Sequence, residues 1–163
     1  MSIATTQYSG LSFTTTFPVI SDRLVNQTGI ASSFAPDGTI SKPNEPTKKY
    51  DALWDTGATC SCVSQRVVDE LFLPVISKRR IKGATGVAAV KNVHVVNLFL
   101  PNNICIAGIQ AVCADIISFD ILIGMDIIKI GDLIISNYKG QTLFTFRCPS
   151  MHSYDFTKHD YFP

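Results

Sequence analysis

The pattern of apolar and polar positions along the chain predicts many short β-strands and very little helix. Stretches rich in Thr, Phe, Val and Ile alternate with turn residues such as Gly, Pro and Asn. We expect strands at residues 11–20, 50–54, 60–63, two within 78–100, one within 104–117, and at 119–123, 133–136 and 141–146. Many short strands separated by turn signals are typical of an all-β, barrel-like domain.

Two short helices interrupt this pattern. Ser64 is a suitable N-cap for a helix over residues 65–71, which ends before Pro74. A second helix of one or two turns fits residues 126–130, with Gly131 at its C-terminal stop.

Two segments show no strand periodicity. Residues 21–49 contain Asn, Gly, Ser and three prolines, so we expect long loops or a hairpin insertion there. Asp37-Gly38 is a hairpin-turn signal within it. The tail after Arg147 is aromatic and polar, without a clear period.

Composition narrows the class of protein. The chain has 163 residues, of which 46% are hydrophobic and 17% charged, as in a globular protein. The net charge is +1 and we identify no basic run, so we expect neither nucleic acid nor a membrane as a partner. The N-terminus does not resemble a signal peptide, and no apolar run reaches the roughly 18 residues of a membrane helix.

The five cysteines do not form the framework of a small secreted domain. We expect them to be mostly reduced, buried thiols in a cytoplasmic protein. Cys60 and Cys62 are separated by one residue, and no matching Cys/His pair follows, so we predict no metal site. In the predicted strand we expect these two cysteines to alternate between core and surface.

The segment with the clearest chemistry is Asp55-Thr56-Gly57, at the end of an apolar strand. A carboxylate in such a place is costly unless its charge is shared, hydrogen-bonded or used. Gly57 lets the backbone turn tightly, and Thr56 supplies a hydroxyl. Taken alone, the three residues also fit an ordinary surface turn.

Three features in order resemble the retropepsin-like aspartic proteases. They are the strand that ends in Asp55-Thr56-Gly57-Ala58, a glycine-bounded hairpin at 83–86, and the run Ile121-Leu122-Ile123-Gly124 before a short helix. Retroviral proteases, the protease domain of DNA-damage-inducible proteins and bacterial single-domain relatives form this family. The resemblance covers about residues 48–147 and implies an all-β, retropepsin-like acid-protease barrel with one or two short helices and one half-site per chain. We expect one domain over 1–163, with 21–49 inserted and 148–163 as a C-terminal tail.

The resemblance also assigns roles. Asp55 would be the catalytic carboxylate, the Thr56 hydroxyl would tie two active-site loops together across a dimer, and Gly57 would lie along the substrate backbone. Gly124 would pack against the catalytic loop. The residues implied to border the substrate are Leu53, Ala58, Leu122 and the flap residues Gly83, Ala84, Thr85 and Gly86. Trp54 departs from the aliphatic residue expected before the aspartate, and we expect Asp126 to be structural, as a helix cap or a partner of a buried donor.

Two carboxylates that share one proton can activate water and protonate a leaving amine without a cofactor. The chain has one Asp-Thr-Gly, so a two-carboxylate site requires a homodimer. We therefore predict an aspartic endopeptidase (a peptide hydrolase) that acts on extended peptide or protein substrates. One alternative is a catalytically silent retropepsin-like module for peptide binding or dimerisation. Another is a protease whose insertion or tail covers the cleft and is removed by self-cleavage.

Overall fold

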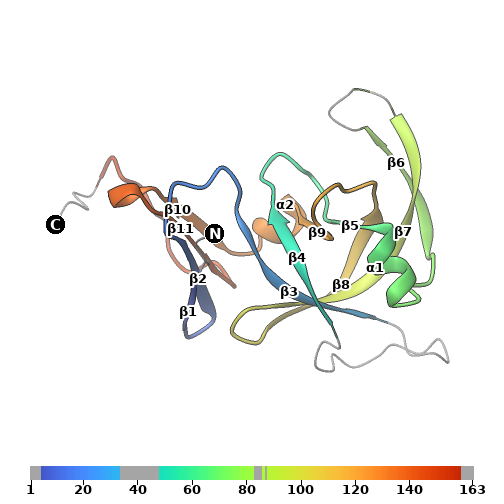
Figure 1. The fold of residues 1–163 in the computed structure, drawn as a ribbon, viewed down its shortest axis with the longest axis horizontal. Coiled ribbons are helices and arrows are strands. Elements are labelled where there is room, and N and C mark those ends of the chain that lie inside the picture. Colours follow the sequence, from blue (N-terminus) through green and yellow to red (C-terminus); the bar gives the residue numbers. More distant parts are fainter. Residues whose placement is uncertain (1–4, 34–47, 83–85, 87, 159–163) are drawn as a thin grey trace.

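The computed structural model describes residues 5–33, 48–82, 86 and 88–158 (Figure 1). Strands dominate, and the expectation of an all-β fold with two short α-helices is confirmed. The strands are β1 (Thr5–Ser9), β2 (Ser12–Phe17), β3 (Val25–Ser32), β4 (Lys48–Trp54), β5 (Cys62–Val63), β6 (Ser77–Lys82), β7 (Ala88–Leu100), β8 (Ile104–Cys113), β9 (Ile121–Ile123), β10 (Asp132–Ser136) and β11 (Thr142–Arg147). The helices are α1 (Gln65–Glu70), α2 (Met125–Ile128) and the 3-10 turn η1 (Tyr138–Gly140).

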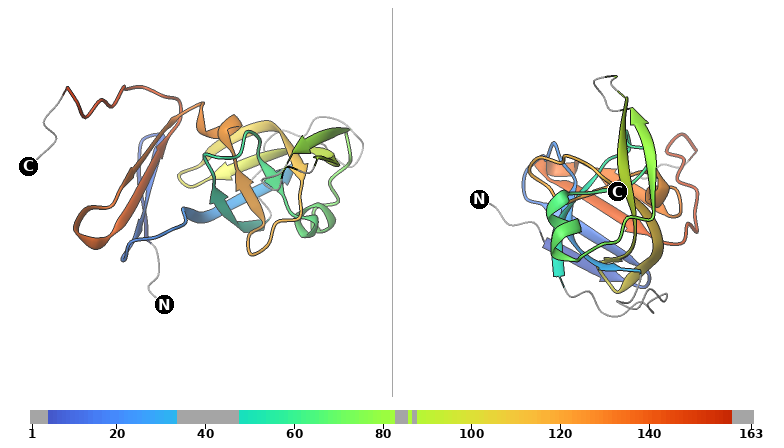
Figure 2. Two further views of the ribbon diagram at one scale, coloured as in Figure 1. Left: turned by 90° about the horizontal axis from the view of Figure 1, so that it is seen from above. Right: turned by 90° about the vertical axis from the view of Figure 1, so that its right-hand side faces the viewer.

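The strands form two sheets. The larger sheet has the order β3-β4-β9-β5-β8-β7-β6, and an additional pairing of β3 with β7 closes six of its strands into a barrel. Strand β6 lies outside this closure and pairs with β7 alone among the described strands. The smaller sheet, β1-β2-β11-β10, lies beside the barrel (Figure 2).

Strand β3 corrects the expectation of long loops over residues 21–49. Val25–Ser32 pairs with both β4 and β7, so it belongs to the barrel, and β3 with β4 makes an antiparallel hairpin. Its buried residues include Asn26 and Thr28, whose polar side chains resemble loop residues in a sequence. The expected turn at Asp37-Gly38 lies outside the described residues.

Trp54 joins the two sheets, which explains its size. Its side chain is buried and packs against Phe13, Phe144 and Phe146, with the Trp54 and Phe146 ring centroids 4.8 Å apart. The indole N–H donates a hydrogen bond of 2.8 Å to Oδ1 of Asn26. Residue 54 therefore belongs to the core between the sheets, where an aromatic ring buries a large apolar area.

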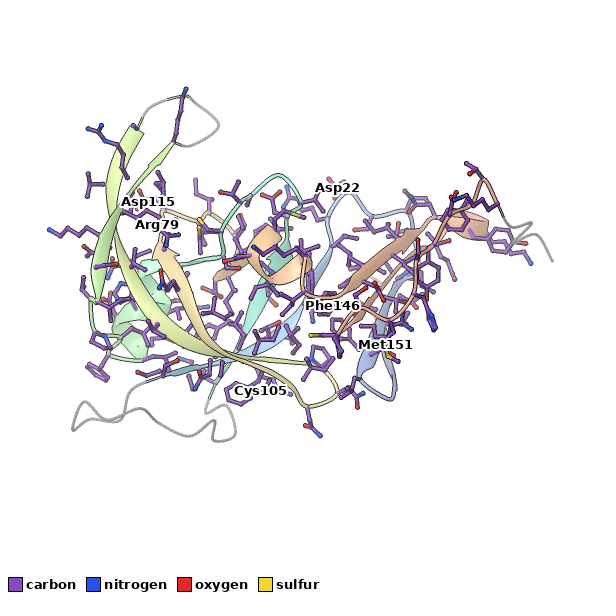
Figure 3. All side chains as sticks on the ribbon, turned by 180° about the vertical axis from the view of Figure 1, so that it is seen from behind. Asp22, Arg79, Cys105, Asp115, Phe146 and Met151 are labelled. Carbon is purple, nitrogen blue, oxygen red and sulfur yellow. The ribbon has the colours of Figure 1, made fainter. Side chains whose placement is uncertain are left out.

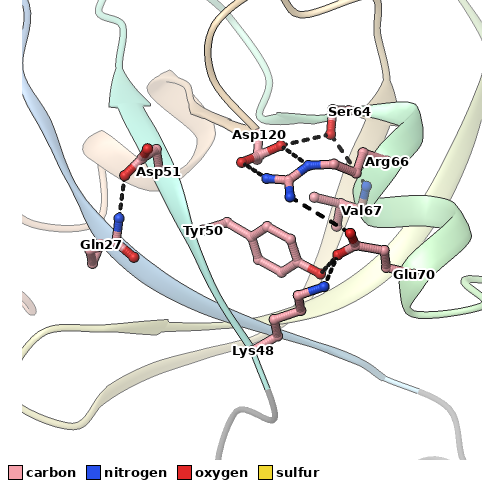
Figure 4. Close-up of polar contacts among 9 residues, drawn as sticks. All are labelled: Gln27, Lys48, Tyr50, Asp51, Ser64, Arg66, Val67, Glu70 and Asp120. Atoms are coloured by element: carbon pink, nitrogen blue, oxygen red, sulfur yellow. Dashed lines mark hydrogen bonds and ion pairs between the residues drawn. The ribbon is translucent and has the colours of Figure 1, made fainter.

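Helix α1 begins as the sequence predicts. Ser64 is its N-cap, and the Ser64 hydroxyl accepts a hydrogen bond from the backbone N–H of Val67. Val67 is the fully buried residue of the helix. The guanidinium of Arg66 forms an ion pair with Asp120, just before β9, which fixes the helix against that strand (Figure 4).

A second polar contact fixes α1 against β4. Glu70 accepts hydrogen bonds from Lys48 and from the hydroxyl of Tyr50 (Figure 4). These bonds lower the pKa of Glu70, first through Lys48 and then through Tyr50. Burial, and then the same contact with Glu70, raises the pKa of Tyr50. Helix α1 is thus held to the start of β9 through Arg66 and to β4 through Glu70.

The second helix is shorter than expected. It spans Met125–Ile128 rather than 126–130, with Lys129 as its C-cap. Gly131 is required for close packing rather than for helix termination, since a Cβ there would lie 2.2 Å from the carbonyl oxygen of Arg147. The tail then continues along β10, where the Ser150 hydroxyl and the Met151 N–H both donate to Asp132.

All five cysteines are described and free, but the expectation that they are buried is wrong. Cys105 is exposed and the other four are half-buried. Among the described residues, no helix has both the length and the apolar character needed to cross a membrane.

Candidate active site

The Asp55 carboxylate is held by its own turn. The Asp55 N–H donates to the Ile123 carbonyl at 2.9 Å, so pairing with β9 continues to the end of β4. The Gly57 N–H then donates to Oδ1 of Asp55 at 2.8 Å. A Cβ on residue 57 would lie 3.2 Å from the same oxygen. Glycine at this position thus allows the backbone to approach the carboxylate closely.

The loop after Asp55 is clamped onto the start of α2, as the sequence analysis expected of Gly124. A Cβ on residue 124 would lie 2.7 Å from the carbonyl carbon and oxygen of Cys60. The Met125 N–H donates to the Ala58 carbonyl at 2.8 Å. Backbone packs against backbone here, so the position of the loop follows from the position of β9.

Ser61 and Asp126 complete this clamp. The Ser61 N–H and hydroxyl donate to the two carboxylate oxygens of Asp126 at 2.9 and 2.7 Å. The Ser61 hydroxyl also accepts from the Gly124 N–H at 3.1 Å. The structural role expected of Asp126 is therefore confirmed.

Ser61 was not predicted from the sequence, where its two cysteine neighbours are the more conspicuous residues. The expectation that Cys60 and Cys62 alternate between core and surface is wrong, because residues two apart in an extended chain lie on the same side. Both are half-buried, and Ser61 between them is the buried residue. The period-two pattern around Ser61 was the signal that could have identified it.

An apolar row crosses the sheet beside Asp55. Directly paired residues share one face of a sheet, and the register aligns residues of β4, β9, β5, β8 and β7 in this way. They are Leu53, Leu122, Cys62, Val112 and Val93. The first three are half-buried and the two valines are buried.

This row contains both predicted and missed residues. Strand alternation puts Asp55 on the face of Leu53, so the carboxylate lies at the end of an apolar surface. Leu53 and Leu122 were predicted to border the substrate, whereas Cys62 was not. Burial raises the pKa of Cys62 to about 12, so its thiol stays protonated and acts as an apolar group.

The other predicted site residues are placed as follows. Thr56 and Gly57 are exposed at the turn, and Ala58 is half-buried. Gly86 is exposed with a φ of +78° and belongs to the connection between β6 and β7. Gly83, Ala84 and Thr85 lie outside the described residues. In Figure 1, strand β4 and the β6–β7 hairpin both point toward the upper side of the molecule.

A separate cavity of about 520 Å³ lies near the start of β9. Its lining includes Arg66, Asp120 and Asp115, each of which already has a charged partner. Its lining also includes Ser64 and Gln65 at the start of α1, whereas the Asp55 N–H bonds to Ile123 at the other end of β9.

The fold and the hydrogen-bonded Asp-Thr-Gly turn define a class of protein: a retropepsin-like all-β fold with one carboxylate turn per chain. The family described as gag-polyprotein putative aspartyl protease matches residues 43–130, more than half of the 163 residues. The chain belongs to this family. The match covers β4 to α2 and therefore the whole of the Asp55 turn and its clamp.

Among solved structures, the chain is similar to a retropepsin-like aspartic protease from Rickettsia conorii, with 9% sequence identity and a TM-score of 0.49. The similarity covers 86% of this chain and 96% of that protein. A comparison with curated proteins found no match.

Proposed function

We propose that this protein is a homodimeric aspartic endopeptidase whose catalytic carboxylate is Asp55. The observation that carries the proposal is the geometry of the turn. One oxygen of Asp55 accepts the Gly57 N–H, and the turn is fixed to β9 and α2 through Gly124. A carboxylate that activates water must be held in a fixed position relative to the substrate, and these contacts hold the Asp55 turn in this way.

The reaction needs a second carboxylate, supplied by a second copy of the chain. Two such carboxylates a few ångströms apart share one proton, because both cannot ionise easily. The ionised one takes a proton from water as the water oxygen bonds to the peptide carbonyl carbon. The protonated one gives its proton to the carbonyl oxygen. One hydroxyl of the resulting diol then gives its proton to the carboxylate that is now ionised, the C–N bond breaks, and the amine leaves with the proton that the other carboxyl took from water, which restores the singly protonated dyad.

The apolar row suggests how a substrate binds. An extended peptide between the sheet face and the β6–β7 hairpin would place alternate side chains on Leu53, Leu122 and Cys62. These residues favour an apolar side chain next to the cleaved bond. Closure of the hairpin over the peptide would exclude water.

The experiment is cleavage of a mixed peptide library by the purified protein from pH 3 to 8, read by mass spectrometry. Asp55→Asn keeps the volume of the side chain and its bond from Gly57, so we expect a folded protein without activity. Asp51→Asn, on the same strand and exposed, is the matched control and should cut like the wild type. Full activity in Asp55→Asn would refute the proposal.

The silent-module alternative has its own outcome in the same experiment. Equal peptide binding by the wild type and Asp55→Asn, with no product from either across the pH range, would establish a binding module. The preorganised carboxylate favours the enzyme, since a binding surface has no need of this costly group.

A further inference from the structure

Strand β6 is an exposed, basic strand at the open end of the barrel sheet. It pairs with β7 on one side, and within the described chain no strand pairs with its other side. Five of its six residues are exposed. Four of the six are basic, namely Lys78, Arg79, Arg80 and Lys82.

The charge of the chain is segregated into this hairpin. Residues 71–114 contain Lys91 and the four basic residues of β6, but neither Asp nor Glu. In the remainder of the chain, nine basic residues face thirteen acidic ones. The net charge of +1 is therefore the sum of a basic segment, 71–114, and an acidic remainder of the chain. The expectation that the chain has no basic run is wrong for residues 78–82.

Part of this charge already has partners. The Arg79 guanidinium donates to Oε1 of Gln110 at 2.9 Å, and Lys91 pairs with Asp115 at 2.6 Å. Figure 3 shows Arg79 and Asp115 at the end of the molecule that carries this hairpin. Arg79 and Lys91 are directly paired across β6 and β7, so they share one face of the hairpin.

The opposite face carries Lys78, Arg80 and Lys82. Alternation puts these three on one side of the strand, with roughly 6.6 Å between their successive Cα atoms. Within the described residues, none of the three forms an ion pair with an acidic side chain. They form a row of available positive charges along an open strand edge.

We propose that the open edge of β6 binds an acidic, extended segment of a polypeptide as an added strand, outside the Asp55 cleft. Unpaired backbone N–H and C=O groups of an edge strand supply hydrogen bonds to such a segment, and the cation row selects carboxylates on alternate residues. Calling the partner a substrate rests on the proposed protease function. The binding itself does not.

A peptide fits this strand better than a nucleic acid does. Single-stranded nucleic acids are held by basic grooves together with aromatic side chains on which bases stack. Strand β6 has no aromatic residue, and those of β7 are limited to His94, which is buried, and Phe99, which is at the far end. An edge with free main-chain groups and regularly spaced cations is the arrangement that an acidic β-strand complements.

The test measures binding to full-length Asp55→Asn, which separates it from cleavage. The probe is a fluorescein-labelled peptide of alternating Glu and Thr, followed by fluorescence anisotropy at low and moderate salt. The triple substitution Lys78→Gln, Arg80→Gln and Lys82→Gln should weaken binding at least tenfold. A peptide with Gln for Glu should bind as weakly, and salt should reduce the affinity of the acidic peptide.

The matched control removes three exposed lysines elsewhere, by Lys49→Gln, Lys129→Gln and Lys139→Gln. It changes the net charge equally and should leave the affinity unchanged. Equal weakening by both triple variants would overturn the proposal in favour of a general charge effect. Tighter binding of single-stranded DNA than of the acidic peptide would overturn it in favour of a nucleic-acid surface.

Main-chain pairing has a separate readout. Two peptides, N-methylated on the odd or on the even residues, each lose the hydrogen bonds of one edge, and one of the two should bind at least tenfold more weakly. Unchanged binding of both would overturn the added-strand geometry. If the acidic peptide binds but the wild type cuts no peptide, the protease proposal fails and the β6 surface stands.

Discussion

Gly124→Ala tests the link between the fold and the Asp55 turn. The substitution adds one methyl group where backbone already meets backbone. The new Cβ would lie 2.7 Å from the carbonyl carbon and oxygen of Cys60 and 3.0 Å from the Ala58 oxygen. No flexible side chain can move aside to make room, so either β9 or the turn after Asp55 must shift.

The size of the effect follows from this geometry. Overpacking a close-packed site costs typically about 1–3 kcal/mol, and a clash with backbone belongs at the upper end. For a chain of this length, each kcal/mol lowers the melting temperature by roughly 2–4 °C, so we expect a loss of about 4–12 °C. A shift of the turn by about 1 Å would lower kcat/KM by roughly 100-fold in the folded protein.

The assay combines urea and thermal denaturation with peptide cleavage by the folded variant. Gly140→Ala is the control, since its φ of +76° strains alanine by about 1–2 kcal/mol although nothing lies within 4 Å of the added Cβ. It should lose stability and keep kcat/KM. Wild-type stability and activity in Gly124→Ala would contradict the packing described here.

Three further predictions concern other contacts. Asp126→Asn removes one of the two carboxylate acceptors for Ser61 and should lower the free energy of unfolding in urea by about 1–3 kcal/mol. The activity of the variant that remains folded should fall as well, because the Asp55 turn is then held less firmly. Trp54→Phe leaves Oδ1 of Asn26 without its donor inside the core and should cost about 1–3 kcal/mol; little change would show that this bond is unimportant. Hydrogen bonds from Ser150 and then Arg147 lower the pKa of Asp132, so its contribution should be complete above about pH 4 and fall as the pH drops toward that lowered value. The difference in melting temperature between the wild type and Asp132→Asn should therefore shrink from pH 6 to pH 2, and a constant difference would contradict this role.

Local signals in the sequence predicted most of the elements. Ser64 capped α1 as expected, because an N-cap depends on residues within one turn. The apolar run that became β9 was also identified, since a strand buried on both sides requires apolar residues throughout. Strand β3 was missed because its buried Asn26 and Thr28 imitate a loop, and only pairing with β4 and β7 makes them strand residues.

In the candidate site, too, some features follow from local sequence and others only from the tertiary structure. The Asp55 turn and the close approach of Gly124 were predictable, because Asp-Thr-Gly and the apolar-apolar-glycine run each carry a short-range pattern. The buried position of Ser61, and its bonds to Asp126 across 65 residues of sequence, were not. Those bonds depend on where α2 meets the turn.

By itself, then, the sequence determined the strand-rich composition, the caps and turns, and the carboxylate at the end of β4, since each depends on neighbours in the chain. The tertiary structure decided which residues meet across strands. It aligned Leu53, Leu122 and Cys62 on one face, turned Trp54 into the core between the sheets, and left the basic strand β6 with an open edge. Sheet register and closure are long-range pairings, and a one-residue shift would reverse every face, so no local pattern specifies them.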